Sequence, residues 1–332
     1  MDASIIVPSF NSEKTIKECI KALKNQDYNG KYEIIVVDDG STDRTTDIVE
    51  KEKVILFKQK NSGPAKARNN GAKIAKGKVL LFIDSDCIAD KNWLKEMLEP
   101  FKDKEVVGVQ GAYKTKQESL VAKFVQYEIE ERYEKMLNSK KIDWIGSYSA
   151  AYKKNIFFAV KGFDESFPQA SGEDPELSFK VSKTKGKLVF NPKAIVYHSH
   201  PETISKYFWV KFYRAFYRIN LYSKHPDKII NDSYTLNSIK VQVLAAYFGT
   251  LMWFLVPLFY FLEMQSMAEI MFAINFVLLI IATLTVFKSC WLMAKKDIKM
   301  SVFAFLMIQV RTLAFMLGLP AGFFNKMIKI RA

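Results

Sequence analysis

Two long stretches without a charged residue lie in the last third of the chain, and they limit the possible folds more than any other feature. Residues 241–262 contain 22 consecutive uncharged positions, and residues 270–287 contain 18 more. A helix of about 20 apolar residues, rising ~1.5 Å per residue, crosses the ~30 Å hydrocarbon core of a bilayer. Each stretch is therefore predicted to be a membrane-spanning helix.

A third apolar stretch, residues 302–324, contains Arg311. An arginine inside a membrane is costly unless it is paired or hydrated. This stretch therefore has two interpretations, a third span or a re-entrant or interfacial segment. The sequence predicts two or three membrane helices and leaves that choice open.

The charges beside the spans predict their orientation. The link at residues 263–269 has two glutamates and no basic residue, whereas residues 288–299 carry four lysines. Loops rich in Lys and Arg stay in the cytoplasm. We therefore expect a multi-pass protein of the cell membrane with residues 1–200 on the cytoplasmic face. A third full span would place the basic tail, Lys326, Lys329 and Arg331, outside, against the same rule.

Aromatic residues alternate with Lys206, Lys211, Arg214 and Arg218 in residues 203–222. This composition is typical of a helix in the lipid headgroup layer, with its cations reaching phosphates. Stacking on nucleic acid is the competing interpretation of such a segment and of the net charge of +14. Because these cations lie next to the spans, we predict membrane lipids as the partner and no nucleic acid.

The first 200 residues alternate between short apolar strands and amphipathic helices. Strands are predicted at 4–7, 33–37, 54–57 and 79–83, and helices at 13–25 and 64–75. Such alternation predicts an α/β fold with a doubly wound, mostly parallel, Rossmann-like sheet. The expected domains are a catalytic domain at 1–200, amphipathic juxtamembrane helices at 201–240 and an α-helical membrane domain at 241–332.

Polar clusters follow three of the predicted strands, at residues 8–11, 38–41 and 84–86. Ligands of doubly wound sheets bind beyond the carboxyl ends of the strands. Asp84 and Asp86, one residue apart, are suited to Mg²⁺ or Mn²⁺, which prefer oxygen ligands. Asp39 is placed to bind a base or a ribose. The alternative is that these acidic residues cap helices.

Seven segments resemble, in order and spacing, the inverting family 2 glycosyltransferases of the GT-A fold. The segments are IIVPSFN, VVDDGSTD, NSGPAKARNNGA, FIDSDC, GSYSAAYKK, GFDESF and GEDPELSFKV. The resemblance covers about residues 3–200. Phe10 departs from the usual tyrosine of the family, which removes a hydroxyl but keeps an aromatic face.

The resemblance implies a role for each matched residue, with a UDP-sugar as the expected donor. The nucleoside contacts would be Pro8, Ser9, Phe10, Asn11 and Asp39, the diphosphate contacts Lys66 and Arg68, and the ribose and metal contacts Asp84, Ser85 and Asp86. Asp174 would be the catalytic base that deprotonates the acceptor hydroxyl, with Glu173 setting its pKa or position. The alternatives are that Glu173 and Asp174 only start a helix, and that Lys66 and Arg68 lie on a solvated helix face.

Further candidates come from the residues themselves. His198 and His200 follow a predicted strand and, being two residues apart, are expected to point the same way, toward the metal or the diphosphate. His198 is the preferred metal ligand of the two. The third histidine, His225, is expected in a polar linker without a specific role. Gln110, Asp143 and Trp144 belong to a loop region, 108–147, that is expected to influence sugar specificity, and Trp144 is a candidate acceptor contact.

A general base predicts the class of acceptor. A sugar hydroxyl needs deprotonation, whereas a polyprenyl phosphate attacks with an oxygen that is already ionised. Together with the membrane helices, Asp174 favours a saccharide carried on a polyprenyl or dolichyl lipid, or a glycolipid. The Gln-x-x-Arg-Trp motif expected of a processive synthase does not occur, so a non-processive enzyme of glycoprotein or surface-glycan synthesis is predicted. The alternatives are a polyprenyl- or dolichyl-phosphate sugar transferase and a catalytically silent membrane scaffold. A nucleotidyltransferase is disfavoured because no glycine-rich basic loop follows the first strand.

Overall fold

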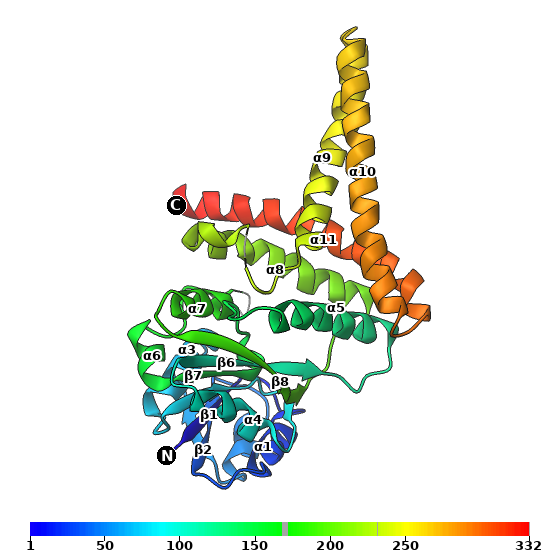
Figure 1. Cartoon of the computed structure of the whole chain (residues 1–332). Coiled ribbons are helices and arrows are strands. Elements are labelled where there is room, and N and C mark those ends of the chain that lie inside the picture. Colours follow the sequence, from blue (N-terminus) through cyan, green and yellow to red (C-terminus); the bar gives the residue numbers. More distant parts are fainter. Residues whose placement is uncertain (168–171, 231, 332) are drawn as a thin grey trace. The chain divides into compact units, whose positions relative to one another are not determined.

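The computed structural model describes residues 1–167, 172–230 and 232–331 (Figure 1). Contacts group the chain into two units. Unit 1 comprises residues 1–117, 129–200 and 220–234, and unit 2 comprises residues 118–128, 201–219 and 235–332. The division of the sequence at residues 200 and 240 remains a prediction.

Unit 1 is built on an eight-stranded sheet with the order β3-β2-β1-β4-β7-β6-β8-β5. The strands are β1 (Ala3–Ser9), β2 (Tyr32–Asp38), β3 (Ile55–Lys58), β4 (Val79–Phe82), β5 (Ile88–Ala89), β6 (Val106–Lys114), β7 (Ala150–Lys153) and β8 (Lys187–Tyr197). β1 lies between β2 and β4, parallel to both, with Ile5 opposite Ile34 and Leu81. The predicted α/β, GT-A-like fold class is confirmed.

The far half of the sheet is mixed. β7 runs antiparallel to both β4 and β6, and β5 runs antiparallel to β8, while β6 and β8 are parallel. Antiparallel strands need no crossover helix, so this half carries less of the strand-helix alternation that makes the first half visible in the sequence.

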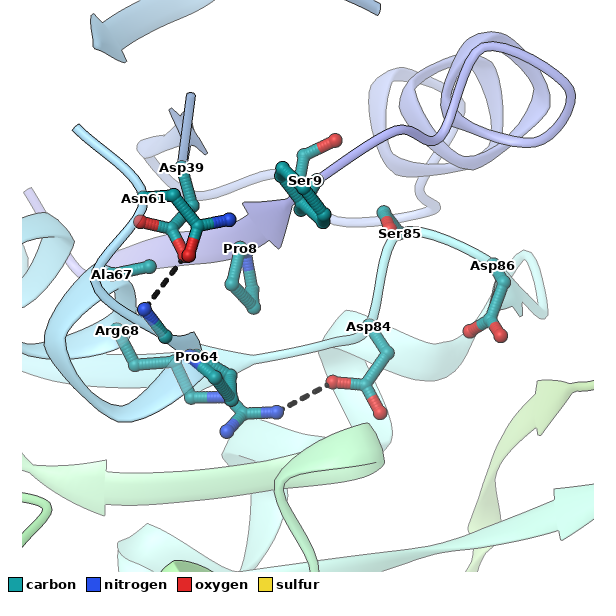
Figure 2. A pocket seen from close by; sticks show the side chains of 12 residues that line it. Pro8, Ser9, Asp39, Asn61, Pro64, Ala67, Arg68, Asp84, Ser85 and Asp86 are labelled. Carbon is teal, nitrogen blue, oxygen red and sulfur yellow. Dashed lines mark hydrogen bonds and ion pairs between the residues drawn. The ribbon is translucent and has the colours of Figure 1, made fainter. Parts of the chain in front are cut away.

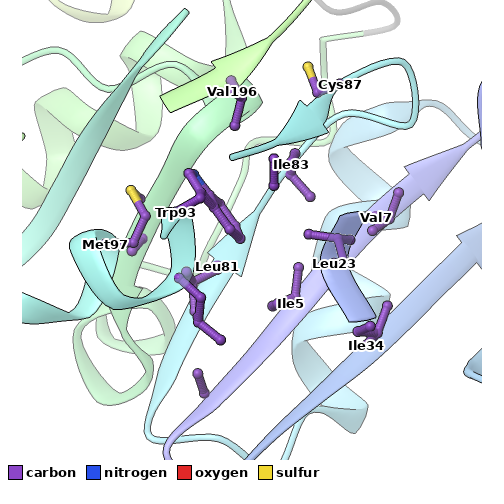
Figure 3. Packing of buried hydrophobic residues seen from close by; sticks show 14 of the residues in the cluster. Ile5, Val7, Leu23, Ile34, Leu81, Ile83, Cys87, Trp93, Met97 and Val196 are labelled. Carbon is purple, nitrogen blue, oxygen red and sulfur yellow. The ribbon is translucent and has the colours of Figure 1, made fainter. Parts of the chain in front are cut away.

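The helices of unit 1 cover both faces of the sheet. They are α1 (Ile16–Lys24), α2 (Thr45–Glu50), α3 (Pro64–Ile74), α4 (Trp93–Leu98), α6 (Lys154–Ala159) and α7 (Glu173–Ser182), with short 3₁₀ turns at Glu99–Lys102, Ser147–Ser149 and Pro226–Lys228. α1 buries Ile16, Ile20 and Leu23, the face predicted from their spacing. Figure 3 shows Leu23 packing with Ile5 and Trp93 in the core between the sheet and the helices on one face.

α3 packs closely under β1 because it carries a glycine there. A Cβ at Gly71 would lie 2.5 Å from Cγ2 of Ile6, which is closer than side-chain carbons pack. Pro64 is at the first turn of the helix, where its missing N–H costs nothing. The start of α3 is thereby brought to the carboxyl end of β1.

Unit 2 contains α9 (Asn237–Phe261), α10 (Gln265–Ala294) and α11 (Lys299–Arg331), all long and apolar enough to cross a membrane. α9 and α10 lie side by side as an antiparallel hairpin (Figure 1), and Nε2 of Gln242 on α9 donates a 3.2 Å hydrogen bond to Oγ1 of Thr285 on α10. Two further helices, α5 (Leu120–Leu137) and α8 (Ile204–Lys224), are each divided between the two units.

Candidate active site

A cavity of about 520 Å³ opens at the carboxyl ends of β1, β2 and β4 (Figure 2). All three polar clusters predicted at these strand ends contribute to it. Its lining residues are Pro8, Ser9, Phe10, Asp39, Asn61, Gly63, Pro64, Ala67, Arg68, Asp84, Ser85 and Asp86. The strand ends are joined by side chains, since Oγ of Ser12 lies 2.8 Å from Oγ of Ser85.

Asp39 organises one wall of the cavity. Its carboxylate accepts 2.8 Å hydrogen bonds from Nε2 of Gln59 and from the backbone N–H groups of Ser62 and Gly63. Gly63 has a φ of 89°, which favours glycine, and it is the N-cap of α3. Asp39 therefore holds the loop that presents Asn61, Gly63 and Pro64 to the cavity.

Arg68 connects the cavity to the start of α7. Its side chain is 3% exposed, with one terminal nitrogen 2.9 Å from Oδ1 of Asp84 and the other 2.9 Å from Oε1 of Glu173. The second nitrogen also lies 3.9 Å from Oδ1 of Asp174. Both terminal nitrogens of this cation are thus bound to carboxylates, where the sequence suggested a diphosphate contact. Figure 2 shows the pair with Asp84 on the cavity wall.

Asp84 and Asp86 differ in their environments. Burial and the charge of Asp86 raise the pKa of Asp84, against the opposing effect of Arg68. Burial also acts to raise the pKa of Asp86, but hydrogen bonding and charge from His198 outweigh it and lower the pKa. Oδ2 of Asp86 lies 3.3 Å from Nε2 of His198. Of these two aspartates, Asp86 therefore stays ionised more readily.

The donor set around Asp86 suits a divalent cation only with help from a substrate. Among the described residues, no three His, Cys, Asp or Glu side chains are arranged to hold a metal. Asp86 and His198 are adjacent, whereas Asp84 is turned to Arg68. A carboxylate oxygen and an imidazole nitrogen are ligands that Mn²⁺ accepts, and phosphate oxygens and water would have to fill the other positions.

Asp174 lies in the first turn of α7, next to Glu173. Its Oδ2 accepts a 3.0 Å hydrogen bond from the backbone N–H of Ser147, while the buried Oδ1 has no hydrogen-bond partner among the described residues. Burial, followed by the charge of Glu173, raises the pKa of Asp174 to about 7, although Arg68 acts in the opposite direction. A carboxylate with a pKa near neutrality is well suited to general-base catalysis.

The two histidines after β8 are close together, with their Nδ1 atoms 3.4 Å apart. The ring of His198 packs against Tyr113, at 4.8 Å between centroids, and Tyr113 stacks on Tyr148 at 3.5 Å. His200 is buried, and its backbone N–H donates to the side chain of Gln117. The aromatic stack fixes the ring that faces Asp86.

Several predicted site residues do not line the cavity. Lys66 is exposed on α3, and Asn11, with φ 49°, uses its side-chain oxygen to accept from Thr42. Trp144 stacks on Tyr234 at 4.8 Å, with the rings 12° from parallel. Asp143 pairs with Lys228 at 2.6 Å. The roles assigned to these residues remain predictions.

Two residues near Asp174 have structural partners that local sequence does not reveal. Gln110 is buried and accepts from the backbone N–H of Gly146, in the loop that carries Ser147. His225 is buried too, with Nε2 3.7 Å from Oε1 of Glu176 on α7, so this histidine makes a structural contact, and its expected lack of a specific role stays a prediction. Their partners lie 36 and 49 positions away, a separation at which no periodic pattern operates.

Comparisons with known proteins relate the first half of the chain to glycosyltransferases. Residues 4–159 match the family model described as Glycosyl transferase family 2. A poly(ribitol-phosphate) beta-N-acetylglucosaminyltransferase of Staphylococcus aureus is 44% identical over 103 residues, 29% of this chain and 18% of the relative. A pre-mycofactocin glycosyltransferase of Mycobacterium tuberculosis is 25% identical over 237 residues, 68% of this chain and 49% of the relative. The matched regions thus span half or less of these curated relatives.

One solved structure is similar over nearly the whole chain. A mannosyltransferase from Pyrobaculum calidifontis, in complex with GDP-Man and Mn²⁺, superposes with a TM-score of 0.57. The match covers 94% of this chain and 86% of that one at 17% sequence identity. At this identity the similarity concerns the fold alone.

Proposed function

Because residues 4–159 match the family model described as Glycosyl transferase family 2, we propose that the chain is a member of that family and acts as an inverting, metal-dependent and non-processive glycosyltransferase. The donor is a nucleotide sugar, with a UDP-sugar expected, and the acceptor is a hydroxyl of a lipid-linked saccharide or glycolipid. The observation that carries the proposal is the bridge made by Arg68, which joins Asp84 on the wall of the cavity to Glu173 beside Asp174.

On the donor side, the nucleoside occupies the cavity beside Asp39 and the β1 end. Pro8, Ser9 and the half-exposed ring of Phe10 offer surface for a base and ribose. The three hydrogen bonds that Asp39 already accepts leave one acceptor site, on Oδ2, because a carboxylate has about four such sites. Asp84 and Ser85 lie across the cavity from this wall.

Asp86 and His198 are the residues that would hold Mn²⁺ or Mg²⁺. When bound, such a cation neutralises charge on the diphosphate leaving group. His198 also acts on its own, because it keeps Asp86 ionised. The Tyr113 ring packed against His198 limits its rotation and so fixes the direction of Nε2.

On the acceptor side, Asp174 takes the proton. The hydroxyl oxygen of the acceptor forms a bond to the anomeric carbon as the bond from that carbon to the diphosphate oxygen breaks, and the hydroxyl proton passes to Asp174. The Ser147 N–H donates to Oδ2 and so fixes the orientation of the carboxylate that accepts the proton. Attack on the face opposite the leaving group inverts the anomeric configuration.

The membrane helices support a lipid-linked acceptor. Three helices among the described residues are long and apolar enough to cross a membrane, and we propose that they hold the protein in the cell membrane with the catalytic part on the cytoplasmic face. A lipid-anchored saccharide confined to that membrane meets the enzyme without leaving the bilayer. The basic residues before α9 suit phosphate groups of the carrier or of neighbouring lipids.

Thermal-shift and transfer assays together test the proposal. Full-length protein in detergent is heated with UDP- and GDP-sugars, with and without Mn²⁺, because a ligand that binds the folded state raises the melting temperature. We expect one donor to raise it more with Mn²⁺ than without. Transfer is then measured with lipid-linked saccharides and with polyprenyl phosphate, for the parent and for Asp174→Asn.

The expected result is transfer to the saccharide, reduced about 10²–10⁴-fold in Asp174→Asn, the range typical of general-base catalysis. Transfer to polyprenyl phosphate that Asp174→Asn leaves intact would instead indicate the polyprenyl-phosphate sugar transferase. If no donor shifts the melting temperature and no acceptor is modified, the proposed activity is wrong and a silent membrane scaffold is favoured.

A further inference from the structure

α11 differs from the other two apolar helices in how much of it is buried in the structure. In its most apolar 18-residue window 44% of the residues are buried, against 17% for α9 and 6% for α10. A helix that faces lipid all round leaves most of its surface free, as α10 does. α11 instead has one face held by protein.

The covered face of α11 packs on α8, backbone against backbone. A Cβ at Gly318 would lie 2.5 Å from the carbonyl oxygen of Phe212, and one at Gly322 would touch the carbonyl oxygen of Phe216. Both pairs are four residues apart, so the two helices run in the same direction with their axes close together. Ala215 and Phe315 add an apolar contact between them.

Arg311, the residue that made a third span doubtful, is held on the same covered face. Its guanidinium donates to Oε1 of Glu128 at 2.8 Å and to the side-chain oxygen of Gln242 at 2.6 Å. The other oxygen of Glu128 accepts from Lys211 of α8. Glu128, Arg311 and Lys211 are all at most 3% exposed. The Arg311 cation is therefore paired inside unit 2. The free-energy cost of an unpaired arginine in a membrane then no longer decides whether α11 crosses a bilayer.

The direction of α11 decides whether this helix crosses the bilayer. Figure 1 shows α11 running across the α9–α10 hairpin and alongside α8. When the hairpin stands across the bilayer, a helix crosswise to it lies along the membrane surface. We propose that α11 does not span the membrane but lies with α8 in the headgroup layer of one leaflet, so that the chain crosses the bilayer only twice. The inference rests on the membrane anchorage proposed above.

The charges fit this lipid partner. α8 exposes Trp209 and Tyr213 beside Lys206 and Arg214, the pairing of aromatic rings and cations found in helices at the bilayer interface. Two crossings also keep Lys326, near the end of α11, on the same side as the lysines of residues 288–299. The conflict that a third span creates with the positive-inside rule disappears.

A cysteine-labelling experiment tests the number of crossings. The full chain, with Cys290→Ala and a cysteine-containing tag after Ala332, is expressed and inverted membrane vesicles of the host are treated with a membrane-impermeant maleimide. Cys19 and Cys87 are buried. Two tag-free variants give the reference sides, Lys51→Cys in unit 1 and Ser266→Cys in the first turn of α10, next to the link with α9, both at exposed positions.

We expect the tag to be labelled to the same extent as Lys51→Cys, and Ser266→Cys to be labelled only after the vesicles are lysed. A tag labelled together with Ser266→Cys would overturn the proposal, because it would place the end of α11 on the other side. If alkaline carbonate releases the protein from the membrane, the anchorage itself is wrong, and that failure is distinct from a third span.

Depth measurements separate an interfacial helix from a re-entrant one. Leu313→Cys and Leu279→Cys replace leucines near the middle of α11 and α10 that are at least half exposed, so that little packing is lost. Each carries an environment-sensitive dye in phosphatidylcholine–phosphatidylglycerol vesicles with lipid quenchers at the headgroup or at the bilayer centre. We expect headgroup-level quenching for position 313 and central quenching for position 279. Central quenching at both positions would refute the interfacial placement.

Discussion

At the scale of single residues, the pKa of Asp174 makes a prediction about stability. The carboxyl has a pKa of about 7 in the folded chain, against an ordinary value of 3.8. Between these values the folded chain holds the proton more tightly than the unfolded chain, so stability falls as the pH rises from about 4 to about 7 and then levels off. We predict that Asp174→Asn is more stable than the parent at pH 8, by about 1–3 kcal/mol, with little difference near pH 4. Denaturant unfolding at both pH values measures this.

Asp143 supplies the matched control. Burial acts to raise its pKa too, but hydrogen bonds from Lys228 and Ser233 outweigh burial and lower the pKa. Ionisation of Asp143 therefore stabilises the fold, and Asp143→Asn is expected to lose stability at pH 8. If both variants lose stability at pH 8, the ionised Asp174 carboxylate does not destabilise the fold. The raised pKa would then be wrong, and it would no longer support Asp174 as the general base.

Arg68 makes the second prediction at this scale. Its planar guanidinium binds two carboxylates from different elements at once, which the single nitrogen of lysine cannot do with the same geometry. We predict that Arg68→Lys lowers the free energy of unfolding by about 2–4 kcal/mol, because it leaves a buried carboxylate short of its partner.

Arg44→Lys is the control for Arg68→Lys, since Arg44 is 80% exposed and pairs with Glu13 at the surface. A change within about 0.5 kcal/mol is expected there. Equal unfolding midpoints for Arg68→Lys and the parent would show that the bridge contributes nothing to stability.

At the scale of elements, the sequence predicts the half of the sheet that follows strand-helix alternation. The predicted strand at 79–83 corresponds to β4 (Val79–Phe82), and the predicted helix at 64–75 corresponds to α3 (Pro64–Ile74). β7, with the sequence Ala-Ala-Tyr-Lys, carries no strong strand signal. It forms because it pairs antiparallel with two neighbours, β4 and β6, and such pairing is tertiary information.

For the candidate site and for Arg311, too, tertiary contacts could not be predicted from local sequence. Residues directly after strands, such as Asp39 and Asp84, are brought to one cavity as their position predicts. The partners of Arg68 and Arg311 are not predictable from spacing, because Glu173 and Glu128 lie 105 and 183 positions away. Local sequence identifies a residue that needs a partner, and only the packed structure supplies the partner.

The close packing of α11 on α8 makes a prediction about a single glycine. A side chain at Gly322 would meet the backbone of Phe216, which cannot move aside as a flexible side chain does. We predict that Gly322→Leu lowers the unfolding free energy by about 1–3 kcal/mol through overpacking, measured by thermal unfolding in detergent.

Gly249→Leu on α9 is the matched control for Gly322→Leu. Within 4 Å of a Cβ at Gly249 lies only the side-chain oxygen of Asn275, at 3.3 Å, among the described residues. Because leucine is a better helix former than glycine, this variant is expected to keep or raise the melting temperature. A Gly322→Leu protein as stable as Gly249→Leu would contradict the close contact of the two helices.

At the scale of the whole molecule, the two units do not follow one another along the chain. After residue 200 the chain leaves unit 1 for residues 201–219 and returns to it for residues 220–234. The contacts of this returning segment with the rest of unit 1 include the following three. Lys228 pairs with Asp143, Tyr234 stacks on Trp144, and His225 lies against Glu176. A change in composition near residue 200 precedes the long apolar helices, but it does not reveal that the chain returns to unit 1.

This return makes a prediction about fragments. A fragment of residues 1–200, the catalytic domain expected from the sequence, lacks all three contacts, whereas a fragment of residues 1–236 keeps them. Both fragments lack the long apolar helices α9, α10 and α11, so they differ in residues 201–236 alone. A partly buried carboxylate, Asp143, without its cation and a lost aromatic stack together cost roughly 2–4 kcal/mol. We therefore predict that the shorter fragment unfolds at a urea concentration lower by about 1 M, for a slope of ~2–3 kcal/mol per M. Equal midpoints would show that residues 1–200 are a complete folding unit and that the returning segment only rests on its surface.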